Sequence, residues 1–292
     1  MSREVRWERM FPDELEAALA ASPVLYLPYG LCEPHGPHNA LGMDALRPWA
    51  FSVQAAQQHG GIVAPPFFWH CHEMGVSASW AHQQVGQSRP WLTAYPPWML
   101  YKSLCYHVRA ADALGFHAVI LLSGHAGPHS PDFPVLRDIL QPHLAARLEF
   151  HLCGDFGVYG NSGHGGAAET AMLWAAFPEC VDMSRLPDPL PPPPNFGLGA
   201  DAREANRRAG EEKIATIVAG LHQTAQRLLA EYDRVQPTWR MVTFDDVEAI
   251  WAEEIEPRLP ELSAMRDLWE GQEAPPEDSR WYPNWRVPQR WG

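Results

Sequence analysis

Short apolar runs alternate with longer amphipathic stretches through the first two-thirds of the chain. The runs that predict buried strands are 24–28, 62–64, 117–122 and 149–153. The stretches that predict helices are 11–19, 44–56, 99–114, 134–148, 167–176 and 202–232. Such alternation predicts an α/β protein with parallel strands joined by right-handed helical crossovers. Ligands bind such sheets beyond the carboxyl ends of the strands, so we look for chemistry there.

The composition of the chain changes near residue 235. Residues 1–235 predict a single α/β domain, and a proline-rich segment within it, 186–194, is expected to be extended. Residues 236–292 form a C-terminal extension rich in prolines and acidic residues. Six of the thirteen tryptophans lie in this extension: Trp239, Trp251, Trp269, Trp281, Trp285 and Trp291. A segment so aromatic is expected to pack on the body or on a neighbouring subunit.

The charge and the cysteines narrow the class of protein. The chain has 22 Lys and Arg against 35 Asp and Glu, a net charge of -13, which disfavours nucleic acids and anionic membranes as partners. No apolar run reaches the roughly 18 residues of a membrane helix, and the N-terminus has no apolar signal core. The five cysteines form no CxxC pair, which favours a reducing compartment. We therefore expect a cytoplasmic protein.

The densest group of reactive side chains follows the first predicted strand, at 33–38 (EPHGPH). Glu33 and His35 are two residues apart, so both point to the same side of an extended backbone. Asp44, at the start of the next predicted helix, can return to that side. Carboxylate and imidazole together suit zinc, manganese or iron. The alternative is a capped turn that carries surface histidines.

Two further groups follow later strands. His125 lies among small residues directly after the clearest strand, where it is either a metal ligand or a loop histidine in a tight turn. His164 and Glu169 flank the start of a predicted helix and can face one cleft, although Glu169 could instead favour the helix dipole. Three such groups near predicted strand ends make a metal site the stronger interpretation.

Three segments resemble the signatures of the creatininase (creatinine amidohydrolase) family. LPYGLCEPHGPHNALGMD resembles LPxGxxExHGxHLPLGTD, GFHAVILLSGHAGPH resembles GFxxIxxxNGHGGN, and HGGAAET resembles HAGxxET. They occur in the family's order, and the likeness extends over residues 20–232. It implies one creatininase-like hydrolase domain, residues 1–235, with a mostly parallel sheet flanked by helices on both faces, followed by the extension 236–292.

The resemblance also implies a hydrolytic site with one or two divalent metal ions per subunit, most simply zinc, with manganese or iron as alternatives. Glu33 and His125 would hold one metal, His35 and Glu169 the other, and Asp44 would bridge them. In the creatininase proper one of these carboxylates comes from the second motif. This chain has Gly127 there, and Glu169 takes its place.

The catalytic chemistry follows from such ligands. Two cations about 3.5–4 Å apart would lower the pKa of a bridging water and polarise an amide oxygen. His164 would stabilise the oxyanion or protonate the leaving nitrogen. Glu73, in the run WHCHE at 69–73, is a second general-base candidate. That run either lines the mouth of the pocket or forms a separate metal site.

The resulting hypothesis is a metal-dependent amidohydrolase that cleaves a non-peptide C–N bond, in a cyclic amide or a formamide, with a metal-activated water. The altered second motif predicts a substrate other than creatinine. The alternatives are a peptidase for small-peptide maturation and a catalytically silent metal-binding assembly protein. The expected partners are a small-molecule substrate and further copies of the chain, a hexamer by family resemblance. Four tryptophans are expected near the pocket, either packing there or stacking on a flat substrate: Trp69, Trp80, Trp91 and Trp98.

Overall fold

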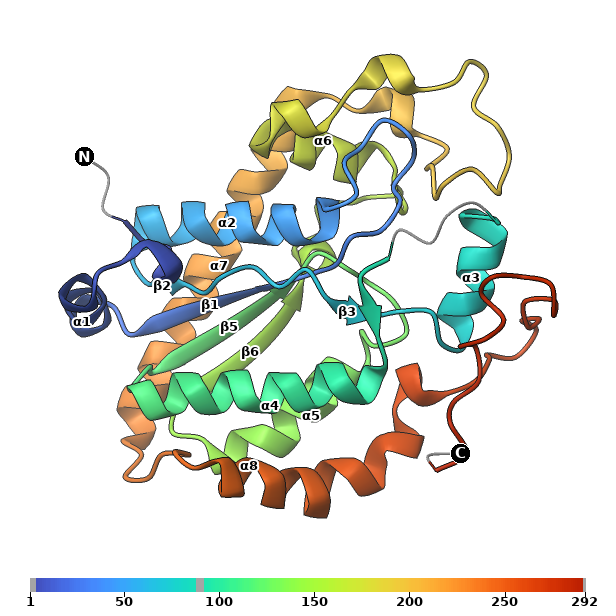
Figure 1. Cartoon of the computed structure of the whole chain (residues 1–292). Coiled ribbons are helices and arrows are strands. Elements are labelled where there is room, and N and C mark those ends of the chain that lie inside the picture. Colours follow the sequence, from blue (N-terminus) through green and yellow to red (C-terminus); the bar gives the residue numbers. More distant parts are fainter. Residues whose placement is uncertain (1–3, 88–91, 291–292) are drawn as a thin grey trace.

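A parallel sheet forms the centre of the protein. The computed structural model describes residues 4–87 and 92–290, and its main sheet has four parallel strands in the order β2-β1-β5-β6 (Figure 1). These strands are β1 Val24–Tyr29, β2 Ile62–Val63, β5 Ala118–Ser123 and β6 Arg147–Leu152. A second, two-stranded parallel sheet pairs β3 His70–Cys71 with β4 Ala94–Tyr95. The predicted α/β class with a mostly parallel sheet is confirmed.

Helices surround this sheet. They are α1 Pro12–Ala21, α2 Met43–His59, α3 Val76–Gln84, α4 Pro97–Leu114, α5 Asp132–Leu140, α6 Ala167–Ala176, α7 Arg207–Val235 and α8 Phe244–Ile250. Shorter 3-10 turns lie at Trp7–Arg9, Gln141–His143, Cys153–Phe156, Pro178–Cys180, Met183–Arg185, Ala202–Glu204, Glu256–Glu261 and Ser263–Met265, and a π turn at Trp251–Ile255 continues α8. None of the described helices combines the length and the hydropathy needed to cross a membrane.

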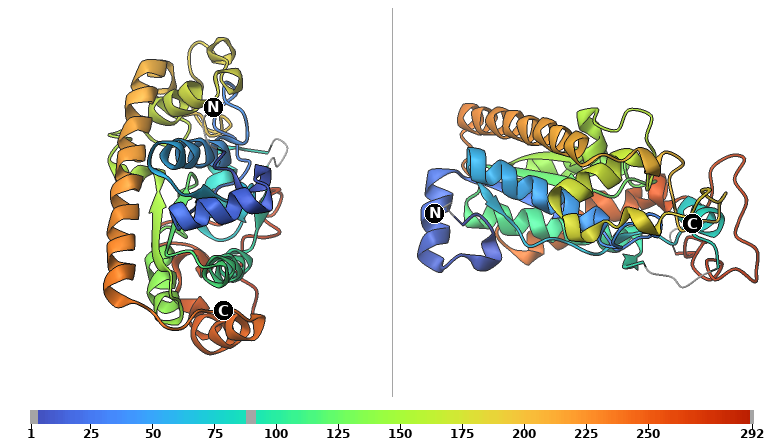
Figure 2. Two further views of the ribbon diagram at one scale, coloured as in Figure 1. Left: turned by 90° about the vertical axis from the view of Figure 1, so that its left-hand side faces the viewer. Right: turned by 90° about the horizontal axis from the view of Figure 1, so that it is seen from above.

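Both faces of the sheet are buried, which explains the continuous apolar runs of the strands. Along β1, Val24 and Tyr26 face the layer of α2, α6 and α7, whereas Leu25 and Leu27 face the layer of α4, α5 and α8. Figure 2 shows α7 running beside the sheet along most of its length. Each buried Val or Leu side chain stabilises the fold by about 1.5–3 kcal/mol. The two layers therefore hold the strand ends in a fixed place.

The helix expected over 134–148 is wrong in its second half, because α5 ends at Leu140. Pro142 lies in the 3-10 turn that follows and cannot donate a helical hydrogen bond. The side chain of Gln141 then binds the backbone on both sides of the turn: it donates to the Ala146 carbonyl and accepts from the Leu148 N–H, at 3.0 and 2.8 Å. The chain is thereby turned into β6, which begins at Arg147 rather than at 149.

The helix expected over 202–232 is also interrupted. A 3-10 turn covers Ala202–Glu204, and α7 begins only at Arg207. The side chain of Asn206 caps α7 by accepting a hydrogen bond from the Ala209 N–H at 3.2 Å. The segment 186–200, which includes the proline-rich stretch, contains no helix or strand.

The described part of the C-terminal extension packs against the rest of the chain. α8 lies along α4 and α5, and the chain then crosses to α3 (Figure 1). Trp251 joins the core of the α4 layer, and Trp281 and Trp285 pack with the alanines of α3. Trp239 and Trp269 are about half exposed, at 52% and 45%, and Trp291 lies outside the described residues. The division at residue 235 stays a prediction.

Candidate metal centre

The carboxyl ends of β1 and β5 meet the start of α2 at close range. A Cβ atom on Gly30, which follows β1, would lie 2.2 Å from the carbonyl oxygen of Asp44, and one on Gly124, which follows β5, would lie 2.1 Å from it. Only glycine fits at either position. The two glycines therefore allow α2 to begin directly against the strand ends, which places the side chain of Asp44 at this edge of the sheet.

Asp44 lies at the centre of a buried cluster of imidazoles and carboxylates. Its Oδ1 atom is 3.2 Å from His35 Nε2, and its Oδ2 atom is 3.3 Å from His125 Nδ1. Asp44 and His35 are 1% exposed and His125 is 4% exposed. The alternative of a turn with surface histidines is therefore wrong for His35. The two oxygens of one carboxylate face two different imidazoles, which divides the cluster into a His125 half and a His35 half.

Glu33 completes the His125 half. Its Oε2 atom lies 3.0 Å from His125 Nδ1, and its Oε1 atom lies 3.1 Å from His72 Nε2. The N–H of Glu73 donates to His72 Nδ1 at 2.8 Å, so that nitrogen carries a lone pair and Nε2 carries the proton. His72 is thus a hydrogen-bond donor that orients Glu33. Sequence reasoning left the run 69–73 either at the pocket mouth or in a separate metal site, and it missed this contact.

Glu169 completes the His35 half. Its Oε2 atom lies 3.7 Å from His35 Nε2 and accepts the N–H of Gly165 at 2.8 Å. His35 Nδ1 donates to the carbonyl of Glu33 at 2.9 Å, so Nε2 is the nitrogen that can exchange a proton for a metal ion. That Nε2 atom finds no hydrogen-bond partner among the described residues, although it is buried. A nitrogen so placed between two carboxylates is positioned to bind a cation.

Arg47 enters the same half of the cluster from α2. Its side chain is fully buried, and Nη2 donates to Asp44 Oδ1 at 2.7 Å, to Glu169 Oε1 at 2.9 Å and to the Gly124 carbonyl at 3.2 Å. Nη1 donates to the Tyr159 hydroxyl at 2.9 Å. Sequence reasoning missed Arg47. The available signal was its position three residues after Asp44, on the same face of a helix.

The electrostatics of the cluster favour positive charge. Burial disfavours the ionised form of Asp44 and Glu33, yet neighbouring imidazoles, His35 and His125 above all, hold the pKa of both carboxyls below the ordinary range. Conversely, burial disfavours the charged imidazoles, but Asp44 raises the pKa of His35 to about 9 and Glu33 raises that of His125 to about 10. Without a metal, these imidazoles bind protons in the cluster.

The donor set fits a divalent metal ion. The ligand atoms of His35, Asp44 and Glu169 lie within 4.8 Å of one another. In the His125 half, Glu33, His72 and His125 form a second group of the same kind, and Asp44 Oδ2 lies 3.3 Å from His125 Nδ1. Imidazole nitrogen and carboxylate oxygen suit zinc, manganese and iron. The structure thus brings together all five residues predicted as ligands.

His164 lies against the cluster, with a ring nitrogen within 4.8 Å of ligand atoms of Glu33 and His35. Its ring stacks on that of His35 with centroids 4.0 Å apart. Its Nε2 atom donates to the carbonyl of Pro34 at 2.9 Å, because a carbonyl can only accept. Burial, together with the neighbouring His35, lowers the pKa of His164, so the ring is neutral near pH 7 and Nδ1 carries the lone pair. His164 is therefore a proton acceptor in its resting state.

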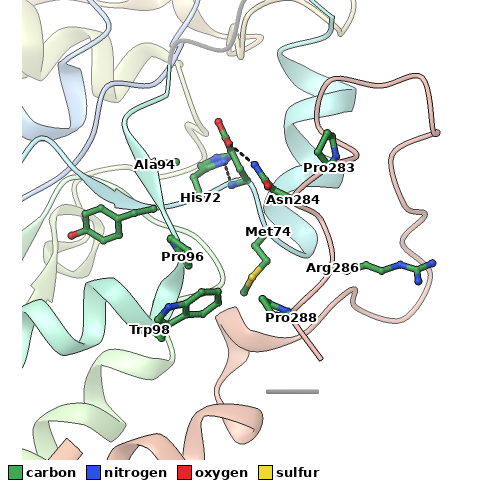
Figure 3. Close-up of a pocket in the computed structure, with 11 residues that line it drawn as sticks. His72, Met74, Ala94, Pro96, Trp98, Pro283, Asn284, Arg286 and Pro288 are labelled. Atoms are coloured by element: carbon green, nitrogen blue, oxygen red, sulfur yellow. Dashed lines mark hydrogen bonds between the residues drawn. The ribbon is translucent and has the colours of Figure 1, made fainter. Parts of the chain in front are cut away.

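Glu73, the other catalytic residue predicted from sequence, does not join the cluster. Its carboxylate accepts a hydrogen bond from Asn284 at 3.4 Å, in a neighbouring cavity of about 340 Å³. Figure 3 shows this cavity, with His72 and Asn284 close together at its top and Met74 and Trp98 below them. The proton-transfer role predicted for Glu73 gains no support from this position.

A second cavity, of about 200 Å³, opens onto the cluster itself. The protein groups around it are Glu33, His72, Val76, Ser77, Trp80, His125, Ala126, Gly127, Pro128, His164, Trp269 and Gln272. Trp269 and Gln272 belong to the C-terminal extension, so this segment forms part of the wall.

The four tryptophans expected near the pocket are distributed unevenly. Trp80 lines the cavity, and its ring packs edge to face against that of His164 with the ring centroids 4.7 Å apart. Trp98 lines the neighbouring cavity, and Trp69 is 52% exposed. Trp91 lies outside the described residues.

A parallel α/β sheet with an imidazole–carboxylate cluster at its carboxyl edge defines the architecture of this protein. The chain belongs to the creatininase family, because the family model for creatinine amidohydrolase matches residues 8–225. The creatinine amidohydrolase of Pseudomonas putida is 26% identical over 264 residues, which cover 76% of this chain and 96% of that protein.

Solved structures share the fold. One described as "Creatininase Mn" has a TM-score of 0.62 at 22% identity and covers 77% of this chain and 98% of its own. A putative creatinine amidohydrolase from Bacteroides fragilis has a TM-score of 0.62 at 18% identity, with 78% and 98% covered. The resemblance seen in the sequence is confirmed.

Proposed function

We propose that this protein is a metal-dependent amidohydrolase that cleaves a non-peptide C–N bond in a cyclic amide or a formamide. The observation that carries the proposal is the placement of Asp44 between two imidazoles, each with a further carboxylate beside it. Its relative in Pseudomonas putida is a creatinine amidohydrolase. Solved relatives are described as "Creatininase Mn" and as a mutant creatininase of "Zn-Zn type".

The residues proposed to hold metal are the five of the cluster. Glu33, Asp44 Oδ2 and His125 Nδ1 offer one set of ligands. His35 Nε2, Asp44 Oδ1 and Glu169 Oε2 offer the other. A divalent cation bound here would lower the pKa of a coordinated water and polarise the carbonyl of the substrate.

Side chains of the protein then carry out the proton transfers. Hydrolysis adds water across the C–N bond, so the attacking water loses a proton and the departing nitrogen gains one. His164 Nδ1 is the base we propose for the first transfer, since Nε2 is held by Pro34. The protonated ring would return the proton to the leaving nitrogen. His72 keeps Glu33 in position through its hydrogen bond to Oε1.

The cavity supports a small substrate. Its volume of about 200 Å³ is below the roughly 300–1,000 Å³ of pockets for drug-sized ligands. Trp80 and Trp269 give it aromatic walls, which suits a compact planar amide better than an extended peptide. A cyclic amide or a formamide is therefore favoured over a peptide, the principal alternative substrate.

Metal content and turnover of the Asp44→Asn variant test the proposal. The substitution keeps the shape of the side chain and removes its charge, and Asp13→Asn, at an exposed position, is the matched control. We expect metal by elemental mass spectrometry in the wild type and the control, and a sharp loss in Asp44→Asn. A screen of cyclic amides and formamides should find turnover that falls by at least about 10³-fold in Asp44→Asn. A wild type that takes up no zinc, manganese or iron would refute the proposal.

A further inference from the structure

We propose that Arg47 takes the place of a second metal ion, so that each chain holds one divalent cation, in the His125 half of the cluster. This inference rests on the proposed function, because it assumes that the cluster binds metal. It concerns how many cations are bound and which ligands hold them, and it follows from the position of one guanidinium.

The guanidinium lies between the two carboxylates of the His35 half. Nη2 donates to Asp44 Oδ1 at 2.7 Å and to Glu169 Oε1 at 2.9 Å. Two further hydrogen bonds fix the guanidinium in this position, because it also donates to the Gly124 carbonyl and to the Tyr159 hydroxyl. The side chain is fully buried, so it has no solvent into which it could withdraw.

The two halves are therefore unequal. In the His35 half, the oxygen of Asp44 that faces the imidazole already binds a cationic side chain. In the His125 half, Asp44 Oδ2 and Glu33 Oε2 lie 3.3 and 3.0 Å from Nδ1 of His125, an imidazole that can be neutral. Glu33 Oε2 finds no hydrogen-bond partner among the described residues, although it is buried. The His125 half is the one whose facing carboxylate oxygens, Asp44 Oδ2 and Glu33 Oε2, bind no guanidinium.

The charge of the cluster leads to the same conclusion. Three buried carboxylates and one guanidinium leave two negative charges, which a single divalent cation neutralises. A second divalent cation would leave an excess of two positive charges among buried side chains. The guanidinium cannot relieve this by losing its proton, because arginine stays protonated in proteins. Buried charge is tolerated only when it is paired, so the second cation is disfavoured.

The same contacts suggest one alternative, in which Arg47 supports a two-metal site from outside. Glu169 Oε2 and His35 Nε2 do not touch the guanidinium and could still bind a cation. The two arrangements differ in the number of metal ions and in the effect of removing Arg47. They can therefore be distinguished by counting the metal ions bound per chain.

The experiment is a count of zinc per chain in the full-length protein, by elemental mass spectrometry after desalting and by calorimetric titration of the metal-free form. Arg47→Met removes the charge and keeps a long side chain. Arg137→Met is the matched control, because Arg137 also binds two carboxylates, Asp138 and Glu149, away from the cluster. We expect one zinc in the wild type and in the control, and two in Arg47→Met. The affinity for the second zinc should rise by at least about tenfold.

Two further variants keep the inference testable should Arg47→Met fail to fold. His35→Ala should leave the single zinc of the wild type in place, whereas Glu33→Gln should remove it. Two tightly bound zinc ions in the wild type would overturn the inference and leave the proposed function standing. A single zinc in folded Arg47→Met, or no bound zinc in His35→Ala, would also overturn the inference and leave the proposed function standing. If neither the wild type nor any variant bound zinc, manganese or iron, both this inference and the proposed function would be overturned.

Discussion

Arg47 lies one helical turn after Asp44 on α2 and donates to its Oδ1 atom at 2.7 Å. The contact is short and fully buried, and it links two residues on one face of a rigid helix. The orientation of the central carboxylate is therefore fixed before any ligand arrives. Positioning of this kind reduces the reorganisation that binding requires.

The first prediction concerns the stability of Arg47→Met. Without metal, this variant leaves Asp44 and Glu169 as buried carboxylates that have lost their guanidinium partner. Breaking a buried ion pair in this way destabilises a protein by about 3–5 kcal/mol. A shift of roughly 2–4 °C per kcal/mol then lowers the melting temperature of the metal-free variant by roughly 10 °C.

Scanning calorimetry of metal-free and zinc-loaded protein checks this prediction. Zinc should restore most of the stability of Arg47→Met, because the cation neutralises the same carboxylates. Arg137→Met, whose ion pairs lie nearer the surface, should shift the melting temperature far less. An equal loss in both variants, with no recovery on zinc addition, would contradict the role assigned to Arg47.

The second prediction separates the two ring nitrogens of His72. Only the donor at Nε2 contacts Glu33, at 3.1 Å, so a side chain that places an N–H at the same distance from the backbone should substitute. Glutamine does so, and leucine does not. Loss of such an outer hydrogen bond typically weakens a metal site by about 10–100-fold.

Zinc titration against a competing chelator measures the effect. We expect His72→Gln to bind zinc nearly as well as the wild type, and His72→Leu to bind it about 10–100-fold more weakly. If both variants lost the metal completely, His72 would be a ligand rather than a residue that orients Glu33.

Much of this arrangement could be predicted from the sequence, because it depends on local patterns. The apolar runs identified the strands, and parallel strands bring their carboxyl ends to one edge of a sheet. Glu33, His35 and His125 follow such strands closely and were found for that reason.

Arg47 and His72 could not be found in the same way. An arginine on an amphipathic helix is normally exposed, and Arg47 is buried because α2 packs closely against Gly124, Tyr159 and Glu169. His72 reaches Glu33 from the loop after β3, and the β3–β4 pair has only two residues in each strand. So short a pairing leaves no periodic pattern in the sequence. In both cases the decisive contact joins segments that are packed together by the tertiary structure.

The third prediction is a pH dependence of the metal-free protein. The pKa of His35 is raised to about 9 by Asp44, and that of His125 to about 10 by Glu33, both from an ordinary value of 6.5. The folded state therefore binds more protons than the unfolded state above pH 6.5. The stabilisation is complete below pH 6.5 and is lost as the pH rises through the folded values.

The melting temperature measured with a chelator should thus fall between pH 6.5 and 8.5. Zinc displaces the same protons, so the zinc-loaded protein should show little of this decline, and the gap between the two forms should widen with pH. His35→Asn should reduce the slope of the metal-free protein. A melting temperature that is constant or rises over this range without metal would contradict the assignment of protons to the cluster.

The last prediction concerns the contribution of the C-terminal extension to the substrate site. Trp269 lies beyond the residues that the family model matches, yet it lines the cavity above the cluster together with Trp80. An aromatic wall stabilises a bound planar ligand by about 0.5–1.5 kcal/mol, so Trp269→Ala should raise the KM by roughly 2–13-fold. The kcat should change little, because Trp269 contributes to substrate binding and takes no part in proton transfer.

Trp239→Ala is the matched control, since Trp239 is 52% exposed and lies outside the cavity lining. Steady-state kinetics on the best amide substrate distinguish the outcomes. An unchanged KM in Trp269→Ala would remove the extension from the substrate site, and an equal change in Trp239→Ala would assign the effect to the stability of the extension.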